Sequence, residues 1–162
     1  MEGRKQNVLQ RFEYQIFADY SQFYLQDDDI RVGDLGDAWT EQAVARLLAV
    51  SRFVVGVGTV RNMTVPVCVE VMDVQPNADF KGFDQVNECS IELPSGSLVV
   101  AGCTDYFPDA ARIKLASGNY VVRVSYSGLE TLDETGLEGN DRYLVQLWPG
   151  DLISPRVVKA RC

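Results

Sequence analysis

Acid–base chemistry in this protein would have to rest on carboxylates, because the chain contains 23 Asp and Glu residues and no histidine. Ser-His-Asp and Cys-His hydrolysis, histidine-ligated zinc and the histidine general base of many nucleases all require an imidazole. Those mechanisms are excluded. A pair of carboxylates, as in glycosidases, is a catalytic arrangement that the composition still permits.

No such carboxylate pair stands out on an apolar strand, where burial would raise one pKa. Glu70, Glu88 and Glu92 lie on strand-like segments whose opposite faces are apolar, so we expect these three side chains to face solvent. We therefore predict that the protein is not an enzyme, that it has no catalytic residues and that it uses no cofactor.

The cysteines and glycines do not form a recognisable ligand site. Cys68, Cys89, Cys103 and Cys162 include no C-x-x-C pair, and their irregular spacing predicts no metal site. Cys68 and Cys89 fall inside strand-like runs, where a reduced thiol packs as a small apolar side chain. The G-V-G at 56–58 lacks the third glycine and the following helix of a dinucleotide site, so it indicates a bulge or close packing.

Length and composition indicate one globular domain spanning residues 1–162, with 1–10 as a flexible N-terminal arm. The first residues contain no apolar core of a signal peptide, and no apolar run is long enough for a membrane span. We expect a cytoplasmic protein with no membrane or nucleic-acid partner, since a net charge of -8 opposes binding to phosphates. The sequence leaves the oligomeric state open.

The apolar pattern has period two over most of the chain, which predicts strands. One exception is an amphipathic helix at about 38–50, in which Trp39, Ala43, Leu47 and Val50 recur at helical spacing. Because helices do not alternate with the strands, we predict an all-β fold, an antiparallel β-sandwich with this single helix. Pro66 cannot donate to a ladder, so its strand is predicted to lie at an edge or to pair on one side only.

Two segments are near copies of each other, IELPSGSLVV at 91–100 and IKLASGNYVV at 113–122. Each has apolar residues two apart, a turn centred on Gly96 or Gly118, and a β-branched run. Such a pattern predicts a β-hairpin, because glycine supplies the positive φ of a tight loop. We expect two separate hairpins that supply similar strands to the same core.

The order of several short motifs resembles the competence protein J family, whose members inhibit the DNA-entry nuclease of competent bacteria. The matching segments are Tyr20-Ser-Gln-Phe23, the Trp39-Thr40-Glu-Gln-Ala helix start, Thr64-Val-Pro-Val-Cys-Val, Leu115-x-x-Gly118-x-Tyr120 and Asp141-Arg-Tyr-Leu-Val. The resemblance spans about residues 12–148. It implies a β-sandwich that binds a protein, and it carries over no catalytic residues.

Two acidic runs are the candidate contacts with such a partner, because an acidic protein can occupy the basic cleft of a nuclease. The predicted partner-binding residues are Asp27, Asp28, Asp29, Glu130, Asp133, Glu134 and Glu138. The simplest competing interpretation is that both runs are solvated loops that keep the protein soluble.

A second functional class remains open, a calcium- or carbohydrate-binding sandwich. Asp27 to Asp29 could hold calcium if Asp105, Asp109 or Asp133 lay close by in the fold, because calcium needs six to eight oxygen ligands. A sugar platform would instead use exposed aromatic rings. The candidate rings are Trp39, Trp148, Tyr14, Tyr120 and Tyr126.

Overall fold

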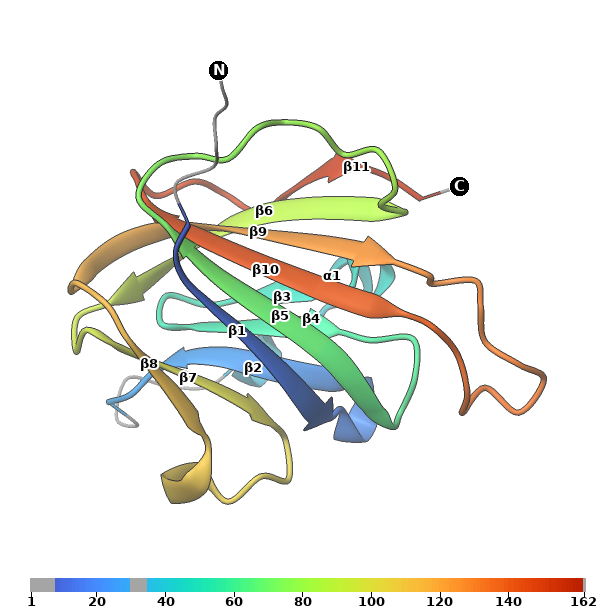
Figure 1. Cartoon of the computed structure of the whole chain (residues 1–162). Helices are drawn as coiled ribbons and strands as arrows, with labels where there is room; N and C mark the ends of the chain where they lie inside the picture. Colours follow the sequence, from blue (N-terminus) through green and yellow to red (C-terminus); the bar gives the residue numbers. More distant parts are fainter. Residues whose placement is uncertain (1–7, 30–34, 162) are drawn as a thin grey trace.

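The computed structural model describes residues 8–29 and 35–161 as two β-sheets packed face to face (Figure 1). The first sheet has six strands in the order β1 (Val8–Phe17), β5 (Thr64–Met72), β10 (Arg142–Pro149), β9 (Gly118–Ser127), β6 (Gln85–Leu93) and β11 (Arg156–Lys159). The second has five, in the order β3 (Leu48–Val50), β4 (Val54–Gly58), β2 (Gln22–Asp27), β7 (Ser97–Gly102) and β8 (Ala111–Lys114). All neighbours are antiparallel except β5 and β10. The predicted fold class is confirmed.

The core lies between the sheets and follows the predicted alternation. Val65, Val67, Val69 and Val71 of β5 are at most 3 % exposed and all face inward. Three aromatic rings fill the middle, with Phe23 and Tyr126 each meeting Tyr143 edge to face at centroid distances of 6.1 and 5.9 Å. Burial of this apolar surface is the main force that holds the two sheets together.

The two repeated segments are not hairpins, and this prediction is wrong. In each copy the strand before the turn and the strand after it belong to different sheets. Gly96 joins β6 of the first sheet to β7 of the second, and Gly118 begins β9 of the first sheet after β8 of the second. A corner between sheets needs the same positive φ as a hairpin, so the local sequence does not distinguish the two.

The copies instead pair with each other. Ile91 lies opposite Tyr120 in the six-stranded sheet, and Ile113 lies opposite Leu98 in the five-stranded sheet. The first half of each copy therefore pairs with the second half of the other. This reciprocal pairing relates the two copies by an approximate two-fold axis. Gly96 is required at this crossing, because its φ is 69° and a Cβ there would lie 2.9 Å from the Leu115 carbonyl oxygen.

The helix is shorter than the predicted 38–50. Helix α1 covers Glu41–Arg46 and is capped by Thr40, whose hydroxyl accepts from the Ala43 N–H at 3.2 Å. It ends where Leu47 adopts a left-handed conformation with φ of 62°, and the next residues form β3. The apolar residues after Leu47 fit the spacing of a helical face, but they form a strand paired with β4.

Two further predictions about strands need correction. Residues 8–10 belong to β1 rather than to a flexible arm, and residues 1–7 lie outside the described part. The strand with Pro66 is not an edge, because β5 pairs with both β1 and β10. Pro66 itself pairs only with β1, since the β10 ladder begins one residue later, at Val67.

The cysteines of the described part are reduced. Cys68 lies in β5 and is half-buried, Cys89 is fully buried in β6, and neither forms a disulfide. Burial raises the pKa of the Cys89 thiol to about 12. This thiol packs as a small apolar side chain, as predicted, whereas Cys162 lies outside the described residues.

Candidate functional site

The loop between β9 and β10, residues 128–141, is a folded projection from one end of the sandwich (Figure 1). Its tip is organised around Asp133, whose Oδ1 accepts from the Thr135 N–H at 3.1 Å and from the Thr135 hydroxyl at 2.6 Å. Thr131 Oγ1 accepts from the Asn140 N–H at 2.7 Å and joins the two sides of the loop. Gly128 begins the projection with a φ of 66°. The position requires glycine, because a Cβ there would collide with the Asn140 carbonyl.

A buried ion pair fixes the base of this loop. Asp141 is 0 % exposed, and its Oδ1 lies 2.6 Å from Arg61 Nε. Its Oδ2 accepts from the Tyr143 hydroxyl at 2.6 Å, and that hydroxyl accepts from the Val60 N–H at 3.0 Å. Arg61 Nη1 also donates to the Leu137 carbonyl at 3.1 Å. The loop is thereby attached to the connection between β4 and β5.

The tyrosine in this network stays protonated. Burial raises the pKa of Tyr143, and its hydrogen bond to Asp141 raises that pKa further. Tyr143 is therefore a hydrogen-bond donor to Asp141 across the neutral pH range. Each buried polar group at the base of the loop has a partner, as a stable buried network requires.

Four of the predicted contact residues lie on this projection and are exposed, namely Glu130, Asp133, Glu134 and Glu138. Hydrogen bonds from Thr135 lower the pKa of Asp133, so its carboxylate stays charged while it shapes the tip. The stretch 128–140 contains no Lys or Arg. Glu130, Glu134 and Glu138 are thus free to contact a partner, whereas Asp133 also maintains the loop.

The other acidic run is built into the fold, and its prediction as a contact surface is wrong for Asp27. Asp27 is 0 % exposed. Its Oδ1 accepts from the N–H and the hydroxyl of Ser95 at 3.0 and 2.8 Å, and its Oδ2 accepts from the Asp29 N–H at 3.0 Å. The side chain holds the corner between β6 and β7 against the end of β2.

Asp28 is also a structural residue. Its carboxylate lies 3.0 Å from Arg112 Nε and accepts from the Ser97 hydroxyl at 3.0 Å. Asp28 and Arg112 are each 29 % exposed, so the pair joins β2 to β8 at the edge of the second sheet. Asp29, the last member of the run, is half-buried.

Asp28→Asn is expected to lower stability by about 0.5–1 kcal/mol at pH 7, the scale of a partly exposed ion pair. The hydrogen bond from Arg112 lowers the pKa of Asp28 in the folded protein. The contribution is therefore present above the unfolded pKa of about 3.9 and disappears as pH falls through the lower folded value. Urea titrations at pH 7 and pH 2.5 should show a smaller difference from wild type at pH 2.5 than at pH 7.

The two acidic runs do not form one patch. Asp27 is the last residue of β2. At the other end of β2, the Ser21 carbonyl accepts from the Thr59 N–H. Thr59 is two residues from Arg61, which pairs with Asp141 at the base of the acidic loop. The runs therefore lie at opposite ends of β2. Of the predicted contact residues, those that are exposed all lie on the loop.

Asp141 and Arg61 are the residues that sequence reasoning missed. Asp141 closes an acidic stretch of the sequence, yet it is completely buried. A signal was present, because Asp141 and Tyr143 are two apart and Tyr143 begins the inward face of β10. Period two places the Asp141 side chain on the core side. Arg61 carries no comparable signal.

The outer face of the six-stranded sheet differs from prediction as well. Glu70 and Glu88 were expected to face solvent, but they are 8 % and 3 % exposed. Glu70 is paired with Arg11 and Gln146, and Glu88 lies 2.9 Å from Arg123 Nε. Both carboxylates are neutralised by a guanidinium group.

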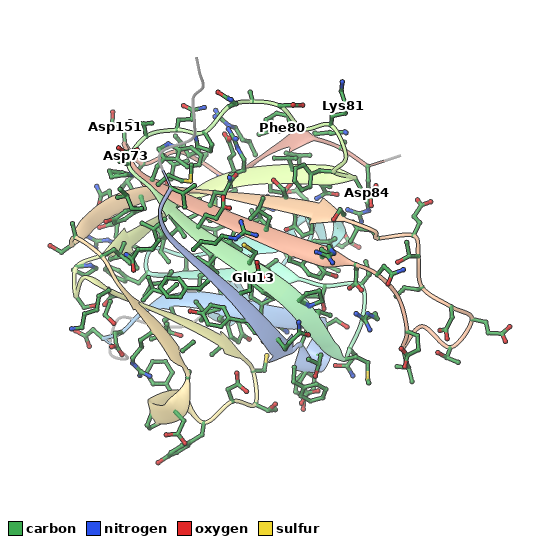
Figure 2. All side chains as sticks on the ribbon, viewed as in Figure 1. Glu13, Asp73, Phe80, Lys81, Asp84 and Asp151 are labelled. Atoms are coloured by element: carbon green, nitrogen blue, oxygen red, sulfur yellow. The ribbon has the colours of Figure 1, made fainter. Side chains whose placement is uncertain are left out.

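Segment 73–84 covers this face around Arg123, and Arg156 of the edge strand β11 adds a second ion pair to Glu88. Arg123 lies between the rings of Phe80 and Trp148, at 5.0 and 5.2 Å from their centroids, and donates to the Asn77 carbonyl at 2.9 Å. Figure 2 shows Phe80 and Lys81 on the segment that crosses above β6 and β9. The fold of this segment was not evident from its polar, glycine-containing sequence.

The features proposed for calcium or sugar binding are not assembled in the described residues. Trp148, Tyr120 and Tyr126 are at most 5 % exposed, whereas Trp39 and Tyr14 are half-buried, so they form no exposed platform. Residues 8–29 and 35–161 contain no group of three or more Asp, Glu or Cys side chains that could hold a metal ion. No helix in these ranges is long and apolar enough to cross a membrane.

Comparison with solved structures identifies the architecture. ComJ from Bacillus subtilis, described as an inhibitor of the DNA-degrading activity of NucA, has a similar structure with a TM-score of 0.65. The match covers 91 % of this chain and 100 % of ComJ at 12 % sequence identity. This chain has the fold of ComJ.

A second similar structure is described as crocagin biosynthetic gene J. Its TM-score is 0.60 at 18 % identity, and the match covers 88 % of this chain and 98 % of the other. No family model and no curated protein matches the sequence. The predicted resemblance to the competence protein J family is therefore confirmed at the level of the fold.

Proposed function

We propose that this protein is a non-catalytic, protein-binding inhibitor that acts on a nuclease with a basic substrate cleft. Its loop at 128–141 would enter that cleft and occupy positions that the phosphates of DNA take. The observation that carries the proposal is the rigid display of Glu130, Glu134 and Glu138 on a projection held by the buried Arg61–Asp141 pair.

Rigidity matters because a disordered acidic loop would have to be ordered on binding, which reduces affinity. Here the internal bonds of Asp133 and the bonds of Arg61 order the loop before any partner arrives. The net charge of -8 would also attract a basic partner from a distance and accelerate association at low salt. The fold shared with ComJ, an inhibitor of NucA, supports the choice of a nuclease as the target class.

The test begins with a nuclease from the native host that co-purifies with the tagged protein. The nuclease is assayed on plasmid DNA with increasing amounts of the tagged protein. Inhibition that saturates at a fixed molar ratio, with no change in the mass of either protein, would support a binding inhibitor. Failure to inhibit any co-purified nuclease would contradict the proposal.

Reversing two exposed charges on the loop should weaken this inhibition strongly. The variant Glu134→Lys, Glu138→Lys should raise the inhibition constant at least about tenfold at low salt. Charges at the edge of an interface attract the partner and thereby also set the association rate. Its affinity should depend less on salt than that of wild type. Inhibition is measured by titration at several salt concentrations.

The matched control is Asp73→Lys, Asp151→Lys, which changes the net charge equally. Both residues are exposed and lie at the end of the sandwich away from the acidic loop (Figure 2). This control should lose only the long-range part of the attraction and retain most of the affinity. Equal losses in the two variants would mean that net charge, and not the loop, drives binding.

A further inference from the structure

Strand β1 has a free edge, and the pairing with β5 identifies its outward-facing backbone groups. The Ala18 N–H donates to the Met63 carbonyl at 2.9 Å, and this pair continues the register in which Ile16 lies opposite Val65. Hydrogen-bonded and non-hydrogen-bonded pairs alternate along an antiparallel ladder. Even-numbered residues of this part of β1 therefore bond to β5, and odd-numbered residues turn their N–H and C=O groups away from it.

The position of proline agrees with this assignment. Pro66 has no N–H and lies opposite Gln15, one of the odd-numbered residues. The outward-facing groups thus belong to Arg11, Glu13 and Gln15. Within residues 8–29 and 35–161, no other strand lies beyond β1 and no hydrogen bond reaches the backbone of these three. Figure 1 shows β1 as the front border of its sheet.

Such an edge can accept another strand. The side chains of Arg11 and Glu13 lie on the outer face of the sheet and are 51 % and 72 % exposed. Two antiparallel copies of β1 related by a two-fold axis at Phe12 would place each Arg11 opposite Glu13 of the second copy. An axis at Arg11 or at Glu13 would place like charges opposite each other instead, which is unfavourable.

The geometry points to a second copy of this chain as the occupant of the β1 edge, in the register centred on Phe12. In that register the outward N–H and C=O groups of Arg11 meet those of Glu13 of the second copy, as an antiparallel ladder requires. The two six-stranded sheets become one continuous sheet. This goes beyond the proposed inhibitor function and needs no nuclease.

The surroundings of β1 fit this arrangement. A hollow of about 250 Å³ lies between the second half of β1 and the segment before β8, and Ile16 and Tyr106 are among its lining residues. The register directs the start of β1 of the second copy, where a bulge lies between Val8 and Gln10, toward this hollow. Val8 and Leu9 are 39 % and 63 % exposed in the single chain, so pairing would cover apolar surface.

Sedimentation equilibrium of the full chain tests the proposal. Wild type should show a reversible dimer of twice 18.0 kDa. Glu13→Lys places a lysine opposite Arg11 in both halves of the interface and should raise the dimer dissociation constant at least about tenfold. Asp151→Lys, with the same charge change at an exposed site near Glu88 and Val121, separated from β1 by β5 and β10, should leave that constant unchanged.

Amide hydrogen exchange gives the register independently. The amides of Phe12 and Tyr14 should exchange slowly at every protein concentration, because they bond to β5. Those of Arg11 and Glu13 should become slow only as the dimer forms. A wild-type protein that stays monomeric at millimolar concentration would overturn the proposal. So would a dimer that Glu13→Lys leaves intact, or one in which the Arg11 and Glu13 amides still exchange rapidly.

Discussion

Replacing Arg61 with methionine should lower the free energy of unfolding by about 3–5 kcal/mol, the usual effect of breaking a buried ion pair from one side. Arg61 and Asp141 are 9 % and 0 % exposed at their side chains and lie 2.6 Å apart. Methionine retains the apolar stem but leaves Asp141 as a buried carboxylate whose remaining side-chain donor is the Tyr143 hydroxyl. Urea denaturation followed by tryptophan fluorescence measures the loss.

The exposed pair of Arg52 and Glu92 provides the control. Its atoms lie 2.8 Å apart, close to the distance in the buried pair, but the Arg52 side chain is 69 % exposed. Arg52→Met should therefore change stability by less than about 1 kcal/mol. Similar effects of the two substitutions would show that burial of the Arg61 pair has no energetic consequence.

Arg61→Met should also reduce inhibition under conditions where the protein remains folded. Arg61 Nη1 donates to the Leu137 carbonyl, and the methionine cannot. The acidic loop would then have to be ordered when it binds. This loss should be measured at a temperature at which circular dichroism shows a native sheet, so that unfolding and loop release are separated.

The second large effect is expected at Glu88. Glu88→Gln should destabilise the fold by about 3 kcal/mol, because it leaves the charge of Arg123 buried without a counter-ion. Arg123 is 2 % exposed and lies 2.9 Å from the Glu88 carboxylate. Glu88 also binds Arg156 of β11 at 2.7 Å, so the substitution should loosen that strand as well.

A double-mutant cycle separates the buried charge from other effects. The variant Glu88→Gln, Arg123→Met removes both charges. Its loss in the free energy of unfolding should be smaller, by about 1–3 kcal/mol, than the sum of the losses in the two single variants. Urea denaturation of the four proteins provides the comparison. Additive effects would mean that the two side chains are not coupled, contrary to their contact.

The strands and the presence of one helix after Trp39 were predictable from the sequence because their causes are local. The recurrence of valine at every second position from Val65 to Val71 needs only the period of a pleated strand, and Thr40 needs only the amides of the next turn to act as a cap. The position at which the helix ends does not have a local cause. Leu48 and Ala49 became a strand because β4 offered a partner.

The status of individual carboxylates could not be read from the sequence. Asp27 and Glu134 both lie in acidic runs, yet one is completely buried and the other is exposed. The difference arises from Ser95, which is 68 positions from Asp27 and donates to it from both its backbone and its side chain. A partner so distant in the chain leaves no trace in the local pattern of charges.

The sequence by itself determined that this is a β-rich protein with strands that alternate apolar and other residues, and with no histidine chemistry. Composition and period suffice for these conclusions, since each residue contributes to them separately. Tertiary structure alone decided which strands share a sheet and which acidic residues reach the surface. The paired copies around Gly96 and Gly118 show the reason, because their ladders join residues that are distant in sequence. Long-range pairing depends on how all strands pack together, whereas period two depends only on the backbone of each strand.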